Sequence, residues 1–152
     1  MRDTKKTIPT SRAKTAWGLI KDVMRAMENE PKRMNMRYYI NTDPDLSEKG
    51  LPVCGTTGCF AGWISLLRRG RSDWRALGHA HALLGSDIRY MIEKRGSGHI
   101  HVFDCGDDIP GNPGTARYMR GVLRRIRRFM KVNEKALKAR KLPPIGTYDS
   151  ER

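Results

Sequence analysis

Three cysteines and a nearby histidine pair are the residues of this sequence best suited to metal or thiol chemistry. Cys54 and Cys59 are separated by four residues, a spacing within the range of zinc-binding pairs, and Cys105 with His101 or His99 could complete a tetrahedral zinc site. Cys54 also precedes an expected helix N-terminus, a position that favours a reactive thiolate. Free cysteines equally serve as small core residues, and three of them make no regular disulfide framework. We therefore favour buried thiols without a bound cofactor, and zinc is the cofactor that the alternative requires.

A second set of residues is suited to binding anions. Basic side chains recur at helical spacing opposite an apolar stripe, and the N-terminal residues add two more: Arg117, Arg120, Arg124, Arg127, Arg128, Lys131, Lys135, Lys138, Lys5 and Lys6. Arg125 widens this band, and Glu134 is the single acidic residue between 115 and 148. Because a guanidinium fork matches a phosphate in a bidentate way, we expect this set to bind phosphates.

The expected mode of binding is independent of base sequence. The sequence has no zinc-finger spacing, no aromatic RNA-binding strand motif and no helix-turn-helix signature. Binding to backbone phosphates would be steeply salt dependent. Tyr118, beside Arg117 and Arg120, has two interpretations: it stacks on an unpaired base, or it packs at the helix boundary, which we favour.

The spacing of apolar residues predicts the elements that position these side chains. We expect helices from residue 10 or 11 to 29, from 60 to 69, from 72 to 84, from 87 to 94 with Ile88, Met91 and Ile92 inward, and from 115 toward Pro143. The last and longest helix buries Ala116, Met119, Val122, Leu123, Ile126, Phe129 and Met130. Residues 99–103 alternate like a strand, with residues 36–40 as a candidate partner. The chosen core anchors are Trp17, Phe60, Trp63, Ile126 and Phe129.

These elements predict a mainly α protein: a single compact helical domain of about five helices, with at most a small two-stranded sheet. A chain of 152 residues with 38% hydrophobic content is long enough for one core. We expect a flexible basic arm over residues 1–9, the helical domain over 10–142, and a flexible tail over 143–152. The net charge of +14 lies at the two ends, since residues 1–14 carry +4, residues 115–152 carry +9 and the middle only +1. The absence of an apolar run of membrane-spanning length favours a cytoplasmic protein.

One segment resembles a known family. The run Cys54-Gly55-Thr56-Thr57-Gly58-Cys59-Phe60-Ala61-Gly62-Trp63 is similar to the CGTxxCxAGW segment of small proteins from phages and prophages. The resemblance implies a phage-type accessory protein acting in the cytoplasm of the host cell. It brings no established activity, so no residue role is carried over. Such proteins include inhibitors of host defence, and a basic inhibitor could occupy a nucleic-acid channel of a nuclease complex.

Two hypotheses about function follow from the sequence. The first is a non-enzymatic basic binding protein that engages nucleic acid or a nucleoprotein complex, with inhibition of a host defence nuclease, such as anti-CRISPR activity, as its specific form. An acidic protein surface is the other partner that the charge would suit, and no membrane partner is expected. The alternative hypothesis is a small zinc- or thiol-dependent enzyme centred on Cys54, Cys59, Cys105 and His101.

Overall fold

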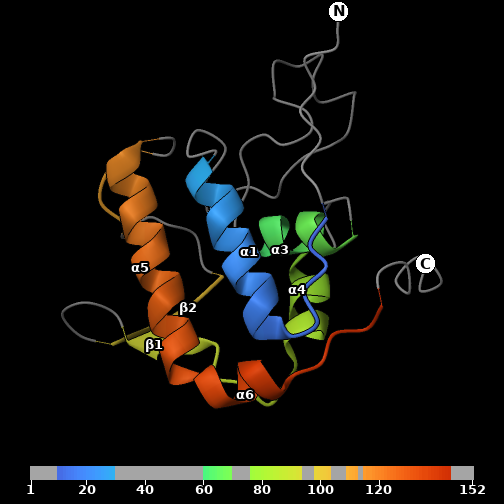
Figure 1. The fold of residues 1–152 in the computed structure, drawn as a ribbon. Helices are drawn as coiled ribbons and strands as arrows, with labels where there is room; N and C mark the ends of the chain where they lie inside the picture. The colour runs from blue at the N-terminus through green and yellow to red at the C-terminus, as the bar shows by residue number, and fades with distance from the viewer. Residues whose placement is uncertain are drawn as a thin grey trace, which may run out of the picture.

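The computed structural model describes residues 10–29, 60–69, 76–93, 98–103, 109–112 and 115–144. Five helices account for 63% of these residues, and one two-stranded antiparallel sheet accompanies them, which confirms the expected fold class. The elements follow one another in the order α1 (Ala16–Asn29), α3 (Phe60–Arg69), α4 (Ala76–Leu84), β1 (Met91–Glu93), β2 (His99–His101), α5 (Ala116–Val132) and α6 (Glu134–Ala139) (Figure 1).

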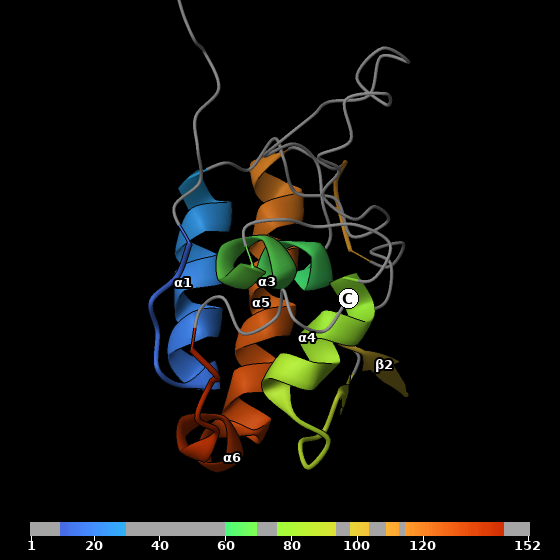
Figure 2. The same cartoon turned by 90° about the vertical axis from the view of Figure 1, so that its right-hand side faces the viewer.

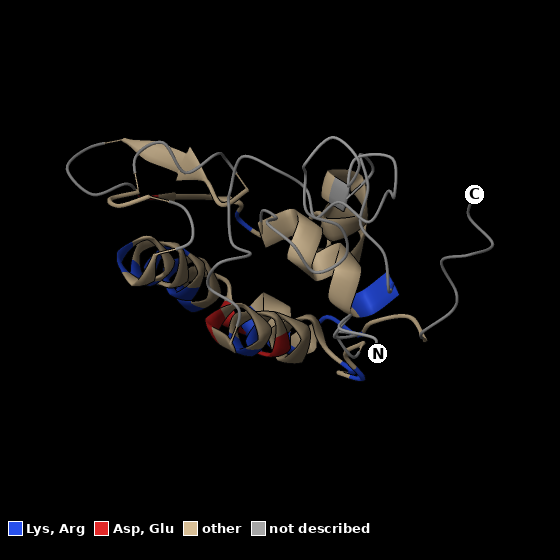
Figure 3. Ribbon diagram, turned by 90° about the horizontal axis from the view of Figure 1, so that it is seen from above, with Lys and Arg blue, Asp and Glu red and all other residues tan. Residues whose placement is uncertain are grey.

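The elements form two layers. Helices α1 and α5 lie side by side and antiparallel in one layer, and α3, α4 and the sheet form the other (Figures 1 and 3). The view turned by 90° shows α3 and α4 in front of α5, on its inner side (Figure 2). Helix α6 follows α5 and contacts α1, so it closes one end of the first layer. The outer faces of α1 and α5 point away from the second layer.

The hydrophobic core lies between the two layers. Helix α1 contributes Ala16, Leu19, Ile20, Val23, Met24 and Met27, and α5 contributes Tyr118, Met119, Val122, Leu123, Ile126, Phe129 and Met130. The Phe60 ring lies among them, with its centroid 5.4 Å from that of Phe103 and 6.5 Å from that of Phe129. Full burial of one large apolar side chain contributes about 1.5–3 kcal/mol. Of the expected anchors, four are fully buried and Trp17 is only partly buried.

Helix α1 begins several residues later than expected. Its first residue is Ala16, and the cap is Thr15, whose Oγ1 accepts a hydrogen bond of 3.2 Å from the Gly18 N–H. Ser11, one of the two residues at which the helix was expected to start, is buried and its hydroxyl donates to Asp22 at 2.6 Å. Residues 11–15 are therefore not helical, and Thr15 instead forms an antiparallel bridge with Lys141.

Arg68 joins the two ends of the described chain. Its side chain is only 3% exposed, and Nη1 donates to the carbonyl oxygens of Ser11 at 3.1 Å and Ala13 at 2.8 Å. Nη2 donates to the Pro143 carbonyl oxygen at 2.6 Å. A buried guanidinium is stable only when most of its donors find acceptors, and carbonyl oxygens from both ends supply them for Nη1 and Nη2, whereas Nε has no hydrogen-bond partner among the described residues.

The helix expected over residues 87–94 does not form over residues 87–93, the part of this range that the structure describes. Residues 91–93 form β1, which pairs with β2 in the register Met91 to His101, Ile92 to Ile100 and Glu93 to His99. The spacing of four between Ile88 and Ile92 fits a strand as well as a helix, because four is a multiple of two and close to 3.6. Both isoleucines are buried, but Met91 is 46% exposed, as the alternation of a strand requires. The suggested partner of β2, residues 36–40, lies outside the described residues.

The single final helix expected from the sequence is two helices. Asn133 separates α5 from α6 and is buried, with its Nδ2 donating to the Arg89 carbonyl oxygen at 2.7 Å. Its Oδ1 accepts from the Arg89 N–H at 2.6 Å. The side-chain amide of Asn133 thus pairs with the backbone N–H and carbonyl oxygen of Arg89, in the segment before β1, as a neighbouring strand would. At the other end of α5, Ala116 is exposed rather than buried as expected.

Candidate nucleic-acid interface

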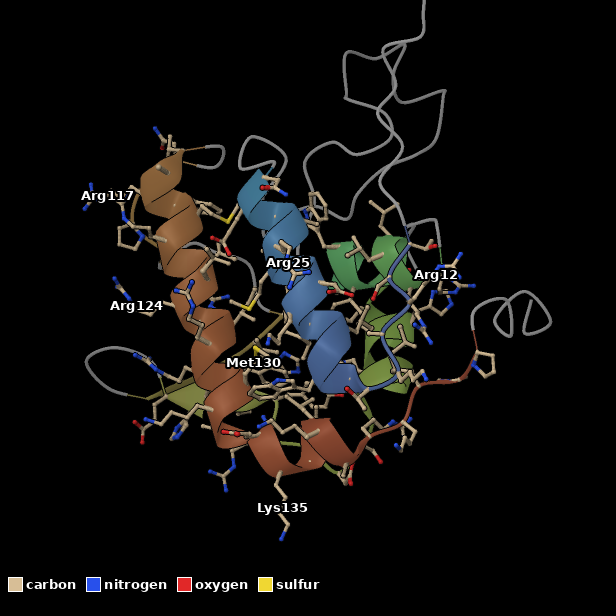
Figure 4. The ribbon with its side chains drawn as sticks, viewed as in Figure 1. Arg12, Arg25, Arg117, Arg124, Met130 and Lys135 are labelled. Atoms are coloured by element: carbon tan, nitrogen blue, oxygen red, sulfur yellow. The ribbon has the colours of Figure 1, made fainter. Side chains whose placement is uncertain are left out.

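The outer face of α5 carries a continuous cationic strip, which we define as Arg117, Arg120, Arg124, Arg127, Arg128 and Lys131. At 3.6 residues per turn these six positions fall within about 100° of arc. All are exposed except the half-buried Arg128, and α5 contains no acidic residue. Figure 4 shows Arg117 and Arg124 extending outward from α5, and Figure 3 shows α5 with basic residues and without acidic ones. The sequence-based expectation of a basic face is met by these six residues.

Local sequence explains why the strip faces outward. The Thr115 Oγ1 accepts a hydrogen bond from the Tyr118 N–H at 3.2 Å and sets the start of α5. The apolar residues then recur at spacings of three and four on the side that packs against the core. The basic residues occupy the remaining positions at the same spacings.

The electrostatics of the strip are repulsive. Six pairs within it are separated by three or four residues, and like charges at these spacings destabilise a helix by about 0.2–0.5 kcal/mol each. Within the described parts of the chain, Arg128 has one hydrogen bond, from Nη1 to the Glu93 carbonyl oxygen at 2.7 Å. The other five members have no hydrogen bond or ion pair to described residues. Their donors are therefore available to an anionic partner.

Two lysines expected to continue the strip lie on α6 instead. Lys135 is exposed, and Figure 4 shows it at the far end of the molecule from Arg117, pointing away from α5. Lys138 forms an ion pair with Glu134 at 2.6 Å, and its Nζ lies 4.7 Å from the centroid of the Trp17 ring. The break at Asn133 is the physical reason. Lys5 and Lys6 lie outside the described residues.

Arg125 and Tyr118 do not belong to the exposed face. Arg125 is 6% exposed, so the expectation that it widens the basic band is wrong. It follows Arg124 by one residue, which turns it about 100° away from the strip and toward the packed side. Tyr118 is 2% exposed, which favours its packing interpretation over stacking on a base.

A groove between α1 and α5 was not anticipated from the sequence. It has a volume of about 280 Å³ and is lined by apolar and charged side chains of both helices and the start of α6: Trp17, Lys21, Met24, Arg127, Met130, Lys131 and Glu134. Figure 4 places Met130 between the two helices. Two members of the strip, Arg127 and Lys131, line this groove as well. The partial burial of Trp17 reflects its place there.

The alternative zinc or thiol site is described only at its histidine. Cys54, Cys59 and Cys105 lie outside the described residues, whereas the His101 ring packs parallel to Tyr90 with centroids 5.4 Å apart. The His101 Nδ1 accepts a hydrogen bond from the Phe103 N–H at 3.1 Å. Among the described residues, no group of three or more His, Cys, Asp or Glu side chains is placed to hold a metal ion.

A second histidine joins this aromatic cluster. The His81 ring from α4 lies 4.4 Å from Tyr90 and 5.5 Å from His101, centroid to centroid. Burial lowers the pKa of His81 below its usual 6.5, and the neighbouring charge of His101 lowers it further. Burial also raises the pKa of Tyr90 to about 12, against the opposing effect of Arg140 and with a smaller contribution from Asp87. His79, two residues before His81, contacts Arg69 instead.

Comparisons with family models, with curated proteins and with solved structures find no match to this chain. None of the described helices is long and apolar enough to cross a membrane.

Proposed function

We propose that this protein is a non-enzymatic binding protein whose cationic strip contacts the phosphate backbone of nucleic acid. The observation that supports the proposal most directly is the strip itself: six basic side chains, no acid on the same helix, and five of the six without a hydrogen bond or ion pair to described residues. A face that destabilises the free helix is expected where a polyanion neutralises it on binding.

The dimensions of the strip suit a nucleic-acid strand. From Arg117 to Lys131 the helix rises about 21 Å, so the strip presents one positive charge per about 4 Å. A strand of a duplex presents one phosphate per about 3.4 Å along its axis. Five of the six charges are guanidinium groups, whose forks match phosphate oxygens in pairs.

The setting of α5 favours contacts to the backbone over reading of base edges. A recognition helix inserts into a major groove about 8.5 Å deep. Helix α5 instead packs against α1 and β1. The strip therefore lies on the surface of the molecule, and α5 does not project from it. Binding should therefore depend weakly on base sequence and strongly on salt.

The finer form of the proposal is a phage accessory protein that engages a nucleoprotein complex in the host cytoplasm, as an inhibitor of a defence nuclease. Its support is the resemblance carried by residues 54–63 together with the basic face. In this form the strip would bind the phosphates of the guide or target strand that the nuclease complex holds.

A charge-reduced variant tests the proposal. We expect Arg120→Gln combined with Arg124→Gln and Arg127→Gln to weaken binding evenly across oligonucleotide sequences. The slope of log K against log salt should shrink by about 0.7 per lost contact with single strands and about 0.9 with duplexes. Binding is measured by fluorescence anisotropy over a salt series.

A matched control removes the same charge elsewhere. Arg12→Gln with Lys14→Gln and Lys141→Gln changes three exposed residues away from α5, and Figure 4 shows Arg12 on the opposite side of the molecule from Arg124. We expect this control to retain most of the affinity. Equal losses in the two variants, or no binding by the parent at low salt, would refute the proposal and favour an acidic protein partner.

A further inference from the structure

We propose that the groove between α1 and α5 holds an unpaired base of a single strand whose phosphates lie on the cationic strip. This inference rests on the proposed function and adds a class of ligand to it: single-stranded rather than duplex nucleic acid. The groove and strip form one surface, because Arg127 and Lys131 belong to both.

The floor of the groove is suited to a planar aromatic group. Trp17 from α1 presents an indole ring, and Met24 and Met130 flank the groove from α1 and α5. Tryptophan stacks on any base because every base has a π face, and methionine sulfur is polarisable and adapts to flat rings. Lys138, which lies over the Trp17 ring, helps to hold the indole in place.

The rim of the groove is suited to the phosphates on either side of that base. Lys21, Arg127 and Lys131 supply three positive charges. The single acid, Glu134, is already paired with Lys138 at 2.6 Å. The local charge therefore complements a polyanion even though one carboxylate is present.

The size of the groove favours one base over the side chains of a protein helix. Its volume of about 280 Å³ is just below the usual range for small-ligand pockets, about 300–1,000 Å³. A bound amphipathic helix needs a longer apolar groove that accepts anchors at several successive turns. A duplex cannot use the groove, because its base faces are already stacked inside the double helix.

The first experiment uses the unmodified protein and four probes. Three are labelled oligonucleotides of about twelve nucleotides: oligo(dT), an abasic oligomer with the same number of phosphates, and a duplex of the same length. The fourth is poly-glutamate of equal charge. We expect oligo(dT) to bind about tenfold more tightly than the abasic oligomer, the scale of one stacked base. The duplex and poly-glutamate should also bind more weakly than oligo(dT).

The second experiment changes the aromatic ring. Trp17→Leu should lower the affinity for oligo(dT) to about that for the abasic oligomer and leave abasic binding unchanged, whereas Trp17→Phe should retain most of the preference. Unchanged abasic binding also shows that the variant is folded and its strip intact.

The outcomes separate this inference from the proposed function. If the parent binds all three oligonucleotides equally, the strip binds phosphates and the base site is wrong. If poly-glutamate binds as tightly as oligo(dT), the base site is likewise wrong and the groove suits an acidic protein. If no oligonucleotide binds at low salt, the proposed function fails and this inference fails with it.

Discussion

Asn133 shows how one side chain can position the candidate interface. Its amide makes two hydrogen bonds to the backbone of Arg89 and a third, of 3.0 Å, to the Phe129 carbonyl oxygen. These bonds end α5, separate it from α6 and fix the segment that leads into β1. The lower end of the strip depends on this arrangement, because Arg128 reaches the Glu93 carbonyl oxygen on β1.

We predict that Asn133→Ala lowers the free energy of unfolding by about 1–3 kcal/mol, since it leaves backbone groups of Arg89 without partners. Asn133→Asp should cost at least as much, because a carboxylate cannot donate to the carbonyl oxygens of Arg89 and Phe129. Urea unfolding measures both, with Asn112→Ala at an exposed position as the control. A change as small as that of the control would contradict the role assigned to the amide.

His81 gives the protein an expected dependence on pH. Its pKa in the folded state lies below 6.5, so the unfolded chain takes up the proton first as the pH falls. The stability associated with neutral His81 is therefore present above pH 6.5 and is lost as the pH falls below that value toward the folded pKa. We predict that unfolding free energy decreases from about pH 7.5 to about pH 5.5.

The same pH series on two variants assigns this slope. His81→Gln should make the decrease shallower, and His99→Gln, at an exposed position on β2, should leave it as in the parent. Equal slopes for the parent and His81→Gln would show that another group is responsible.

At the scale of the helices, the close packing of Gly121 in α5 can be tested by a substitution for which packing and helix propensity predict opposite effects on stability. A Cβ added to Gly121 would lie 2.6 Å from the Ile109 Cγ2, whereas a Cβ on Gly78 in α4 would meet no atom within 4 Å. We predict that Gly121→Ala destabilises the protein by about 1–3 kcal/mol despite the better helix propensity of alanine. Gly78→Ala, the control, should stabilise it by about 0.5–1 kcal/mol. Thermal melts decide, and stabilisation by Gly121→Ala would contradict the packing of residue 109 on α5.

The elements that the sequence predicted well are those with local signals. Thr115, the stripe of α5 and the end of α4 at Gly85, whose φ is +101°, all follow from residues close in the chain. The expected helix over residues 87–94 failed because Ile88 and Ile92 fit both periodicities. The break at Asn133 depends on Arg89, 44 residues away, which no local pattern contains.

The candidate interface likewise has one part that the sequence could predict and other parts that it could not. The basic arc of α5 could be predicted because it uses one helix and its spacing. The groove could not, since it requires α1 and α5 to lie side by side and leaves Trp17 at their junction. The burial of Arg125 could not be predicted either, because nothing in the local sequence distinguishes this arginine from the exposed arginines beside it.

Across the whole molecule, some basic side chains stabilise the fold and others do not. The described residues include 18 Lys or Arg and five Asp or Glu. Some of these cations hold the fold together: Arg68 joins the two ends of the described chain, and Arg140 donates to the Ala82 and Leu83 carbonyl oxygens at the end of α4. The strip has no such role apart from Arg128, so its charges raise the free energy of the isolated protein.

We therefore predict that salt stabilises the free protein. Raising NaCl from about 0.01 M to about 1 M shortens the Debye length from about 30 Å to about 3 Å and should recover roughly 1–3 kcal/mol of repulsion within the strip. The triple variant at Arg120, Arg124 and Arg127 should be more stable than the parent at low salt and less responsive to salt. Urea unfolding at several salt concentrations measures both effects, with the Arg12, Lys14 and Lys141 variant as control. A parent that salt does not stabilise would contradict the repulsive strip.

The most direct test of the central claim is to observe the arginine side chains while nucleic acid is added. In protein made with isotope-labelled arginine, the guanidinium N–H resonances report each side chain separately. We predict that oligonucleotide at low salt shifts the resonances of Arg117, Arg120, Arg124 and Arg127 and leaves those of buried Arg68 and Arg125 unchanged. Absence of shifts on α5, or equal shifts at an exposed arginine away from it such as Arg12, would contradict the claim that the strip is the binding surface.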